Sequence, residues 1–228
     1  MIDRKEVLGA LSGVRDPELD EPITDLEFVS GLEIEDDAVF VRLRLPTYFC
    51  APNFSYLMVA DAKEAVLSVP GTKSVRVVLE DHYASEEINA GVNEERGFDA
   101  AFEGEADGPD LEELRSTFRR KSLVSRQEQL CRSLLADGFS PADLADMTLG
   151  DVPVSAELNT YLERRAELGL EVSPETPLVV DPDGNRVPKG AVVEHLRFAR
   201  LTRVSIEGNA GLCRGLLETR YGSPGVAG

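Results

Sequence analysis

The segment 39–45 alternates strictly between one wholly apolar set of positions and a second set that includes two arginines. One set consists of Val39, Val41, Leu43 and Leu45, and the residues between them are Phe40, Arg42 and Arg44. A period of two is the pattern of a β-strand with one face buried and the other in water. The chain is therefore expected to contain a sheet whose two faces have different surroundings.

The segments around this strand predict a compact α+β unit. A helix is expected over 3–12, where Asp3 and Glu6 resemble a capping box, and residues 14–25 form a loop with two prolines. Residues 27–34 predict a strand that turns at 35–37 into the alternating strand. Pro52 opens a second amphipathic helix, and 74–79 predicts a third strand. The order helix–strand–strand–helix–strand indicates a mixed three-stranded sheet with a hairpin and a right-handed crossover.

The rest of the chain predicts a second, mainly α-helical domain. Helices are expected over 111–121, 123–136, a short stretch after Ser140-Pro141, 155–168, 191–203 and 205–221. Residues 178–180 are a candidate short strand. The predicted organisation is an α+β domain over 1–96, an acidic linker over 97–109, a mainly helical domain over 110–222 and a disordered tail over 223–228.

The formal net charge of −18 is unevenly distributed. Residues 1–110 hold 25 Asp and Glu against 9 Lys and Arg, whereas residues 111–228 hold 17 against 15. Such an acidic surface is repelled by phosphate backbones and by anionic lipid, so nucleic acid and membrane are not expected as partners. A protein client is expected instead, and a homo-oligomer stays open.

The cysteines and the N-terminus indicate the compartment. Three cysteines stand far apart, so a disulfide framework is not expected and the reducing cytoplasm is predicted. The first residues carry charge from the third position on and read as a helix rather than a signal peptide, and no apolar run is long enough for a membrane span.

Cys50 is the candidate functional residue. It lies between the predicted end of a strand and the predicted start of a helix, where free backbone N–H groups and the helix dipole stabilise a thiolate. Such a thiol is a candidate contact for a soft metal. The alternative is that Cys50 is a small buried apolar residue, as lone cysteines usually are.

Four features over residues 3–80 resemble one known family. They are Val14–Glu18 after the first helix, Thr24–Leu26 before the first strand, the Thr47–Pro52 turn and Val69–Gly71 before the third strand. In order and spacing they resemble the iron–sulfur cluster assembly domain family, which includes the bacterial Suf-operon T protein, phenylacetate-degradation protein D and the eukaryotic cytosolic targeting factor. The resemblance covers about a third of the chain.

The resemblance implies an assembly-type domain that helps deliver or insert iron–sulfur clusters, with Cys50 as the contact for metal or cluster. In the family the cysteine directly precedes the proline of the turn. Here Ala51 precedes Pro52 and Cys50 lies one residue earlier, an offset that rotates a side chain by roughly 100° at a helix N-terminus. A subfamily that serves another metal centre, such as a di-iron oxygenase, is an alternative.

The same motifs supply supporting residues. Asp16 and Glu18 match the acidic motif of the family, and either they place carboxylates beside Cys50 or Asp16 accepts N–H groups of its own turn. Thr47 caps the second helix or hydrogen-bonds within the turn, and Pro52 occupies the first helical position.

The remaining candidates are weaker. His82 is expected in a solvated loop, and no Cys/His group has zinc spacing. Cys131 and Cys213 are expected in the core. A stripe on one helix consists of Arg197, Arg200 and Arg203. This stripe is either a solvated face or a docking surface for a client.

These observations predict an accessory maturation factor for iron–sulfur or other iron-containing proteins, and not an enzyme. No permanently bound cofactor is expected, only transient contact with iron or a cluster near Cys50, or client binding. The first alternative is a metal-free adaptor for a multicomponent di-iron oxygenase. A remote alternative is a DNA-binding remnant, since 144–200 faintly resembles part of tyrosine recombinases. That pattern lacks the arginine expected three residues after His195, where Phe198 stands.

Overall fold

The computed structural model describes residues 2–102 and 111–222. The chain divides into two compact units, the first consisting of Met1–Leu111 with Gly208–Gly228 and the second of Glu112–Glu207. The predicted domains were each continuous in sequence, whereas the first unit consists of two separate segments of the chain. Residues from 208 on belong to the first unit because Ala210 and Leu217 are buried in its core. The expected tail, 223–228, lies outside the described residues.

The first unit has the predicted helix–strand–strand–helix–strand order. It contains α1 (Arg4–Ser12), β1 (Val29–Glu35), β2 (Ala38–Arg44), α2 (Pro52–Leu67) and β3 (Ser74–Glu80). Asp3 caps α1 by accepting the N–H of Lys5, and Pro52 opens α2 as predicted. The α+β class of this unit and the helical character of the later region are confirmed.

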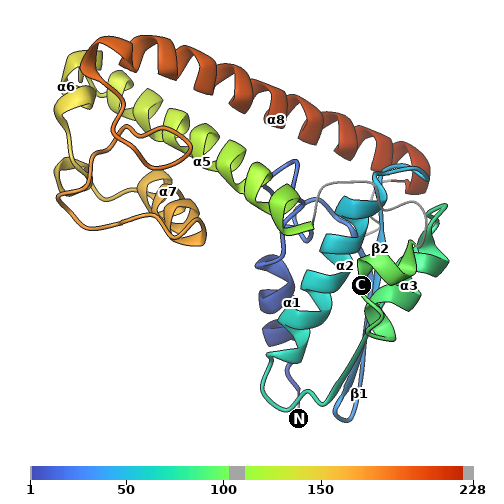
Figure 1. The fold of residues 1–228 in the computed structure, drawn as a ribbon. Coiled ribbons are helices and arrows are strands. Elements are labelled where there is room, and N and C mark those ends of the chain that lie inside the picture. Colours follow the sequence, from blue (N-terminus) through green and yellow to red (C-terminus); the bar gives the residue numbers. More distant parts are fainter. Residues whose placement is uncertain (1, 103–110, 223–228) are drawn as a thin grey trace. The chain divides into compact units, whose positions relative to one another are not determined.

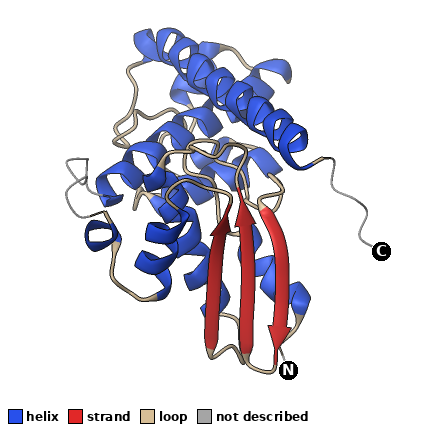
Figure 2. Cartoon of the chain, turned by 90° about the vertical axis from the view of Figure 1, so that its right-hand side faces the viewer, coloured by secondary structure: helices blue, strands red, loops and turns tan. Residues whose placement is uncertain are grey.

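The three strands form one sheet with β2 in the centre, seen as three arrows in Figure 2. β1 pairs with β2 antiparallel, and β2 pairs with β3 parallel. The alternation that predicted β2 also shows which face of the strand is buried, since Val39, Val41 and Leu43 are at most 2% exposed. These side chains pack in a core with α1 and α2, which lie beside each other in Figure 1. Burial of each such side chain contributes about 1.5–3 kcal/mol.

A third helix, not predicted from the sequence, protects the free edge of the sheet. α3 (Ser85–Asn93) follows β3 directly. Asn89 donates to the carbonyl of Leu79 and accepts its N–H, at 3.1 and 2.8 Å. Asn93 makes the same pair of bonds with Val77, at 2.7 and 3.1 Å. The two amides therefore occupy backbone groups that an edge strand otherwise leaves open for another chain.

Part of the predicted linker, 97–109, has regular structure. Phe98–Ala101 form a short helix, α4, instead of unstructured chain. Phe98 packs edge-on against Tyr56 at 5.2 Å between ring centroids and against Phe102 at 4.8 Å. Apolar burial by these rings orders a segment whose overall composition favours a linker. Residues 103–110 lie outside the described residues.

The second unit is helical, as predicted, but its helices are longer. It contains α5 (Leu111–Ala136) from residue 112 on, α6 (Pro141–Asp146), η1 (Leu149–Asp151), α7 (Ala156–Glu167), η2 (Lys189–Ala191) and α8 (Val192–Tyr221) up to residue 207. The predicted breaks near Ser122 and Val204 are wrong, because neither stretch holds a proline or glycine that would end a helix.

Residues 178–180 do not form a named strand within the described chain, although isolated bridges join Thr148 to Pro177 and Val180 to Arg186. The side-chain amide of Gln127 makes the two backbone hydrogen bonds to Val180 that a neighbouring strand would make. It donates to the Val180 carbonyl at 3.0 Å and accepts the Val180 N–H at 2.8 Å.

In the described part of the chain, no helix has the length and apolar character needed to cross a membrane.

Candidate functional site

The candidate site lies in the turn between β2 and α2 of the first unit. Cys50 is half-buried, two residues before Pro52, the first residue of α2. The hydroxyl oxygen of Thr47 lies 3.2 Å from Cys50 Sγ. Ala51 is the N-cap of α2, and no side chain caps the helix. Of the two roles predicted for Thr47, the structure therefore shows the hydrogen bond within the turn, and its partner is the candidate thiol itself.

His82, two residues after the end of β3, hydrogen-bonds to the backbone of this turn. It is 3% exposed, so the predicted solvated loop position is wrong. The backbone N–H of Ala84 donates to Nδ1 at 3.2 Å. Nδ1 is thus the acceptor nitrogen, and Nε2 carries the proton and donates to the carbonyl of Cys50 at 2.7 Å. Sequence position alone did not show that a residue 32 positions away binds the backbone of Cys50.

The environment keeps this histidine neutral. Burial lowers the pKa of His82, the hydrogen bond to the Cys50 carbonyl opposes that effect, and the positive charge of Arg220 adds to it. A neutral ring with one fixed N–H keeps the Cys50 backbone in one place without adding a charge to the site.

The acidic motif forms a loop of its own. Asp16 is 8% exposed, and its Oδ1 accepts the N–H groups of Glu18 at 2.8 Å and Leu19 at 2.9 Å. Burial raises the pKa of Asp16 to about 6, although these two hydrogen bonds act in the opposite direction. Of the alternatives for Asp16, the turn-forming role is the one seen. Glu18 is exposed, and its Oε1 accepts from Asn209 Nδ2 at 3.4 Å.

The last turns of α8 lie against this same region of the first unit. Arg214 forms an ion pair with Glu21. Further along the helix, the guanidinium of Arg220 donates to the carbonyl of Leu45 at 3.1 Å and to that of Asp81 at 2.6 Å. Leu45 begins the Cys50 turn and Asp81 precedes His82, so α8 is attached to the chain on both sides of the candidate site.

Cys213, between these attachments, is not an ordinary core residue. It is half-buried and packs against the same core as Cys50. Burial raises the pKa of Cys213 to about 11, and nearby Asp16, Cys50 and Glu18 raise it as well. By contrast, Cys131 in the second unit is fully buried as predicted, and burial raises the pKa of its thiol to about 12.

Three exposed aromatic side chains lie in the turn or after β3, at the end of the sheet where His82 lies. Tyr48 is 54% exposed, Phe49 74% and Tyr83 51%. The rings of Tyr48 and Tyr83 lie 6.3 Å apart, and that of Tyr83 lies 5.0 Å from His82. We call Tyr48, Phe49 and Tyr83 the aromatic patch. Aromatic residues are enriched where proteins bind each other, and no pattern in the sequence distinguished these three from core aromatics.

The predicted arginine stripe is only partly exposed. Arg203 is 8% exposed within the second unit, where it pairs with Glu128 and, at 2.6 Å, with Glu207. It is therefore not part of an outward docking surface, because its charge is already matched inside the protein. Arg197 and Arg200 are exposed, and their docking role stays a prediction.

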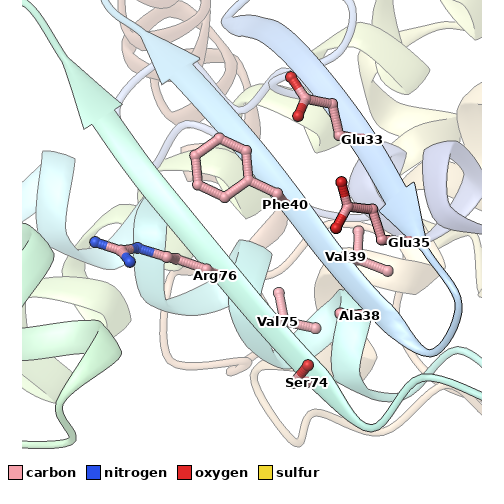
Figure 3. A pocket seen from close by; sticks show the side chains of 8 residues that line it. All are labelled: Glu33, Glu35, Ala38, Val39, Phe40, Ser74, Val75 and Arg76. Atoms are coloured by element: carbon pink, nitrogen blue, oxygen red, sulfur yellow. The ribbon is translucent and has the colours of Figure 1, made fainter.

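Neither of two hollows on the first unit is lined by Cys50. One, between α2 and α3, includes Tyr56 and Lys63. The other lies on the sheet at the end far from the Cys50 turn, where Phe40 and Arg76 project from β2 and β3 (Figure 3). Among the described residues, no three His, Cys, Asp or Glu side chains are grouped so as to hold a metal ion.

Comparison with known proteins singles out the same part of the chain. A sequence model of the family described as iron–sulfur cluster assembly protein matches residues 4–79, about a third of the chain. An uncharacterised protein of Methanocaldococcus jannaschii is 33% identical over 90 residues, which are 39% of this chain and 93% of that protein. No solved structure gives a significant match. The matched segment contains the Cys50 turn and ends just before His82.

Proposed function

The chain belongs, through residues 4–79, to the iron–sulfur cluster assembly protein family, and on that premise we propose that it is an accessory factor that matures an iron-containing client protein. In this proposal it has no turnover of its own. It works in the reducing cytoplasm, where its three free thiols persist. Iron or a cluster is the cargo, contacted transiently at Cys50, and is not a resident cofactor.

The observation that carries the proposal is the setting of Cys50. Cys50 is half-buried, and its sulfur lies 3.2 Å from the Thr47 hydroxyl. Its backbone is fixed by a neutral histidine through a 2.7 Å hydrogen bond. Thiolate sulfur is a preferred ligand of iron in clusters, and a ligand held by a rigid shell needs no reordering when the metal arrives.

The aromatic patch supports client binding at the same place. An exposed phenylalanine and two exposed tyrosines offer a large apolar area that a client would cover. Because the patch includes the two residues before Cys50, a client that covers it would bring its own metal site to the thiol. We propose this patch as the docking surface and keep Arg197 and Arg200 as the competing one.

The second candidate function is a metal-free adaptor, for example for a multicomponent oxygenase. The aromatic patch favours it as well, since client binding needs no metal at Cys50. The two candidates differ in what Cys50 does: it is essential for a metal carrier and dispensable for an adaptor.

Complementation of a deletion strain tests the proposal. Loss of the gene should leave iron-containing clients present but short of iron, measured as iron per polypeptide. Wild type and a Cys131→Ala control should restore the iron, whereas Cys50→Ser, which keeps size but removes the soft ligand, should not. If deletion leaves every iron-containing protein with full iron and activity, both candidates fail.

Docking is tested in the same strain. A Tyr48→Ala/Phe49→Ala variant should lose client association, and Phe198→Ala, which changes a 64% exposed phenylalanine in the second unit, serves as the matched control. If Cys50→Ser is silent while the patch variant leaves clients without iron, the adaptor is the correct function. If only an Arg197→Ala/Arg200→Ala variant loses the client, the docking surface is the arginine pair.

A further inference from the structure

The outer face of the three-stranded sheet carries a row of three side chains of different chemistry. In the register of the sheet, Glu33 of β1 pairs with Phe40 of β2, and Phe40 pairs with Arg76 of β3. Val39 and Val41, on either side of Phe40, are buried in the core, so Phe40 and its cross-strand partners lie on the opposite face. Figure 3 shows Phe40 with Glu33 on one side and Arg76 on the other.

The two ends of this face have different surroundings. Toward the Cys50 turn, the ring of Tyr221 in α8 lies 4.6 Å from the guanidinium of Arg44 on β2. Toward the opposite end, Phe40 and Ala38 line a hollow, and Phe40 is half-buried. The acid and the base beside Phe40 are both exposed. An apolar centre with charged groups around it is the composition of a protein–protein interface.

The charged groups of the row can each take a further partner. Arg42 pairs with Oε1 of Glu33 at 3.0 Å. Its guanidinium lies over Gly31 of β1, where a Cβ would come too close to it, and this holds the carboxylate in place. The second carboxylate oxygen of Glu33 can accept from another cation. Arg76 forms no ion pair with another described residue.

A second copy of the same face is complementary to this row. When two faces meet through a two-fold axis that runs along β2, β1 of one copy lies opposite β3 of the other. Glu33 then faces the partner's Arg76 in both directions, and the two Phe40 rings meet at the axis. In the next row Glu35 faces the partner's Ser74, so a carboxylate meets a hydroxyl donor.

The charges exclude the other two-fold arrangement of the same faces. An axis across the strands places β1 opposite β1, so that Glu33 and Glu35 meet their own copies, and like charges at a contact disfavour association. Two twisted sheets pack with their strands about 30° apart, an angle that side chains as long as glutamate and arginine can bridge.

We propose that the outer sheet face binds a second copy of the chain and forms a two-fold symmetric dimer, with Phe40 at its centre and two Glu33–Arg76 pairs beside it. The inference goes beyond the proposed function and does not depend on metal contact at Cys50. Each favourable pair occurs twice because the contact is isologous. Three strands offer a small face, so the dimer dissociates reversibly, with a dissociation constant on the order of 10–100 µM.

The symmetry has a consequence for the candidate site. Because the axis runs along the strands, the Cys50 turns of both copies lie at the same end of the dimer. The row of contacts does not include the aromatic patch. The dimer therefore presents two thiols and two aromatic patches in the same direction.

Sedimentation equilibrium of the full chain tests the dimer. The wild type, 24.9 kDa as a monomer, should approach the mass of a dimer as its concentration rises. Glu33→Arg and Arg76→Glu each place like charges opposite each other twice, so each should weaken association by at least about 100-fold. Glu64→Arg, a charge reversal at an exposed position of α2, is the matched control and should associate as wild type does.

Mixing the two single variants guards against poor folding. The Glu33→Arg variant presents only positive charge at the two ends of the row, and the Arg76→Glu variant presents only negative charge. An equimolar mixture should therefore form a heterodimer with about the wild-type affinity. A variant that had failed to fold would not be restored by its counterpart.

Three results would overturn the inference. The first is a wild type that stays monomeric up to about 0.5 mM, well above the expected dissociation constant; if Phe40→Ser then abolishes client binding, the face binds the client instead. The second is a dimer that both single variants form as readily as wild type, since the contact then lies elsewhere. The third is a mixture of the two variants that does not associate, because Glu33 then does not face the partner's Arg76.

Discussion

The Gln127 network of the second unit and the Cys50 turn of the first unit treat their polar groups in opposite ways. In the second unit, Gln127 is fully buried, and its amide binds Val180, Tyr161 and His195 at 2.8–3.0 Å. Each partner of this amide lies in the same unit. In the first unit, burial of Asp16 disfavours its charged form and raises its pKa. The turn that hydrogen-bonds to His82 contains the half-buried Cys50, next to the exposed rings of the aromatic patch.

The difference distinguishes a structural polar network from a working one. In a network that only stabilises the fold, every polar group finds its hydrogen-bond partner inside the protein, because each unsatisfied buried group costs free energy. A site that meets a partner keeps its reactive atom and apolar contacts within reach. By this comparison we propose that the second unit is a scaffold and that the first unit holds the functional site.

The largest expected effect comes from breaking the network of the second unit. Gln127→Ala leaves the buried N–H and carbonyl of Val180 without their side-chain partner, so the free energy of unfolding should fall by about 4 kcal/mol. The Tyr161 hydroxyl keeps its hydrogen bond to the Leu178 carbonyl. Denaturant unfolding of the full chain measures it. Gln129→Ala, two residues along the same helix at a half-buried position, should cost less than about 1 kcal/mol. Equal losses would refute the scaffold interpretation.

The next effect is the pH dependence caused by Asp16. Its pKa is about 6 when folded and 3.8 in the unfolded reference, so the folded state holds the proton more tightly. The stability that this provides is fully present below pH 3.8 and is lost as pH rises through 6. At pH 7, Asp16→Asn should therefore be more stable than wild type by about 3 kcal/mol, a difference that vanishes below pH 4.

The control for this titration is Glu18→Gln, which changes an exposed carboxyl of the same loop and should leave the profile of stability against pH unaltered. If wild type and Asp16→Asn have the same profile, Asp16 is not buried as described, and the contrast between the units loses one of its supports.

A smaller effect is expected from the histidine that holds the thiol turn. His82→Ala removes the donor to the Cys50 carbonyl and the acceptor of the Ala84 N–H, which should lower the free energy of unfolding by about 2 kcal/mol. Loosening of the turn should also change the alkylation rate of Cys50. Tyr83→Ala, at the exposed neighbour, is the control and should leave stability within about 0.5 kcal/mol. A Cys50 rate unchanged by His82→Ala would show that the histidine does not position the turn.

Much of the first unit could be predicted because its signals are local. The alternation in β2, the proline that opens α2 and the spacing of the motifs are all readable within a few residues. Cys50 was identified by the same reasoning, since a strand end and a helix start are both visible in the sequence. The two long helices were divided wrongly because polar residues interrupt their apolar pattern without ending the helix.

The remaining site residues depend on contacts over long sequence distances. His82 is 32 residues from Cys50, and its position next to the turn follows only from the parallel pairing of β2 and β3. Cys213 packs against the core of the first unit because α8 returns to that unit, and the burial of Arg203 depends on Glu128, 75 residues away. Neither periodicity nor composition encodes such pairings, so no local pattern could have found them.

Competitive alkylation tests the central claim, that the first unit presents a working thiol at Cys50 while the thiol of the second unit only packs. Limiting iodoacetamide is added to the native full chain, and labelled peptides are quantified over time. We expect Cys50 to react first and Cys213 more slowly, because a pKa of about 11 leaves little thiolate. Cys131 should react only after unfolding. Labelling of Cys131 as fast as Cys50 in the native protein, or labelling of Cys50 only after unfolding, would contradict the account.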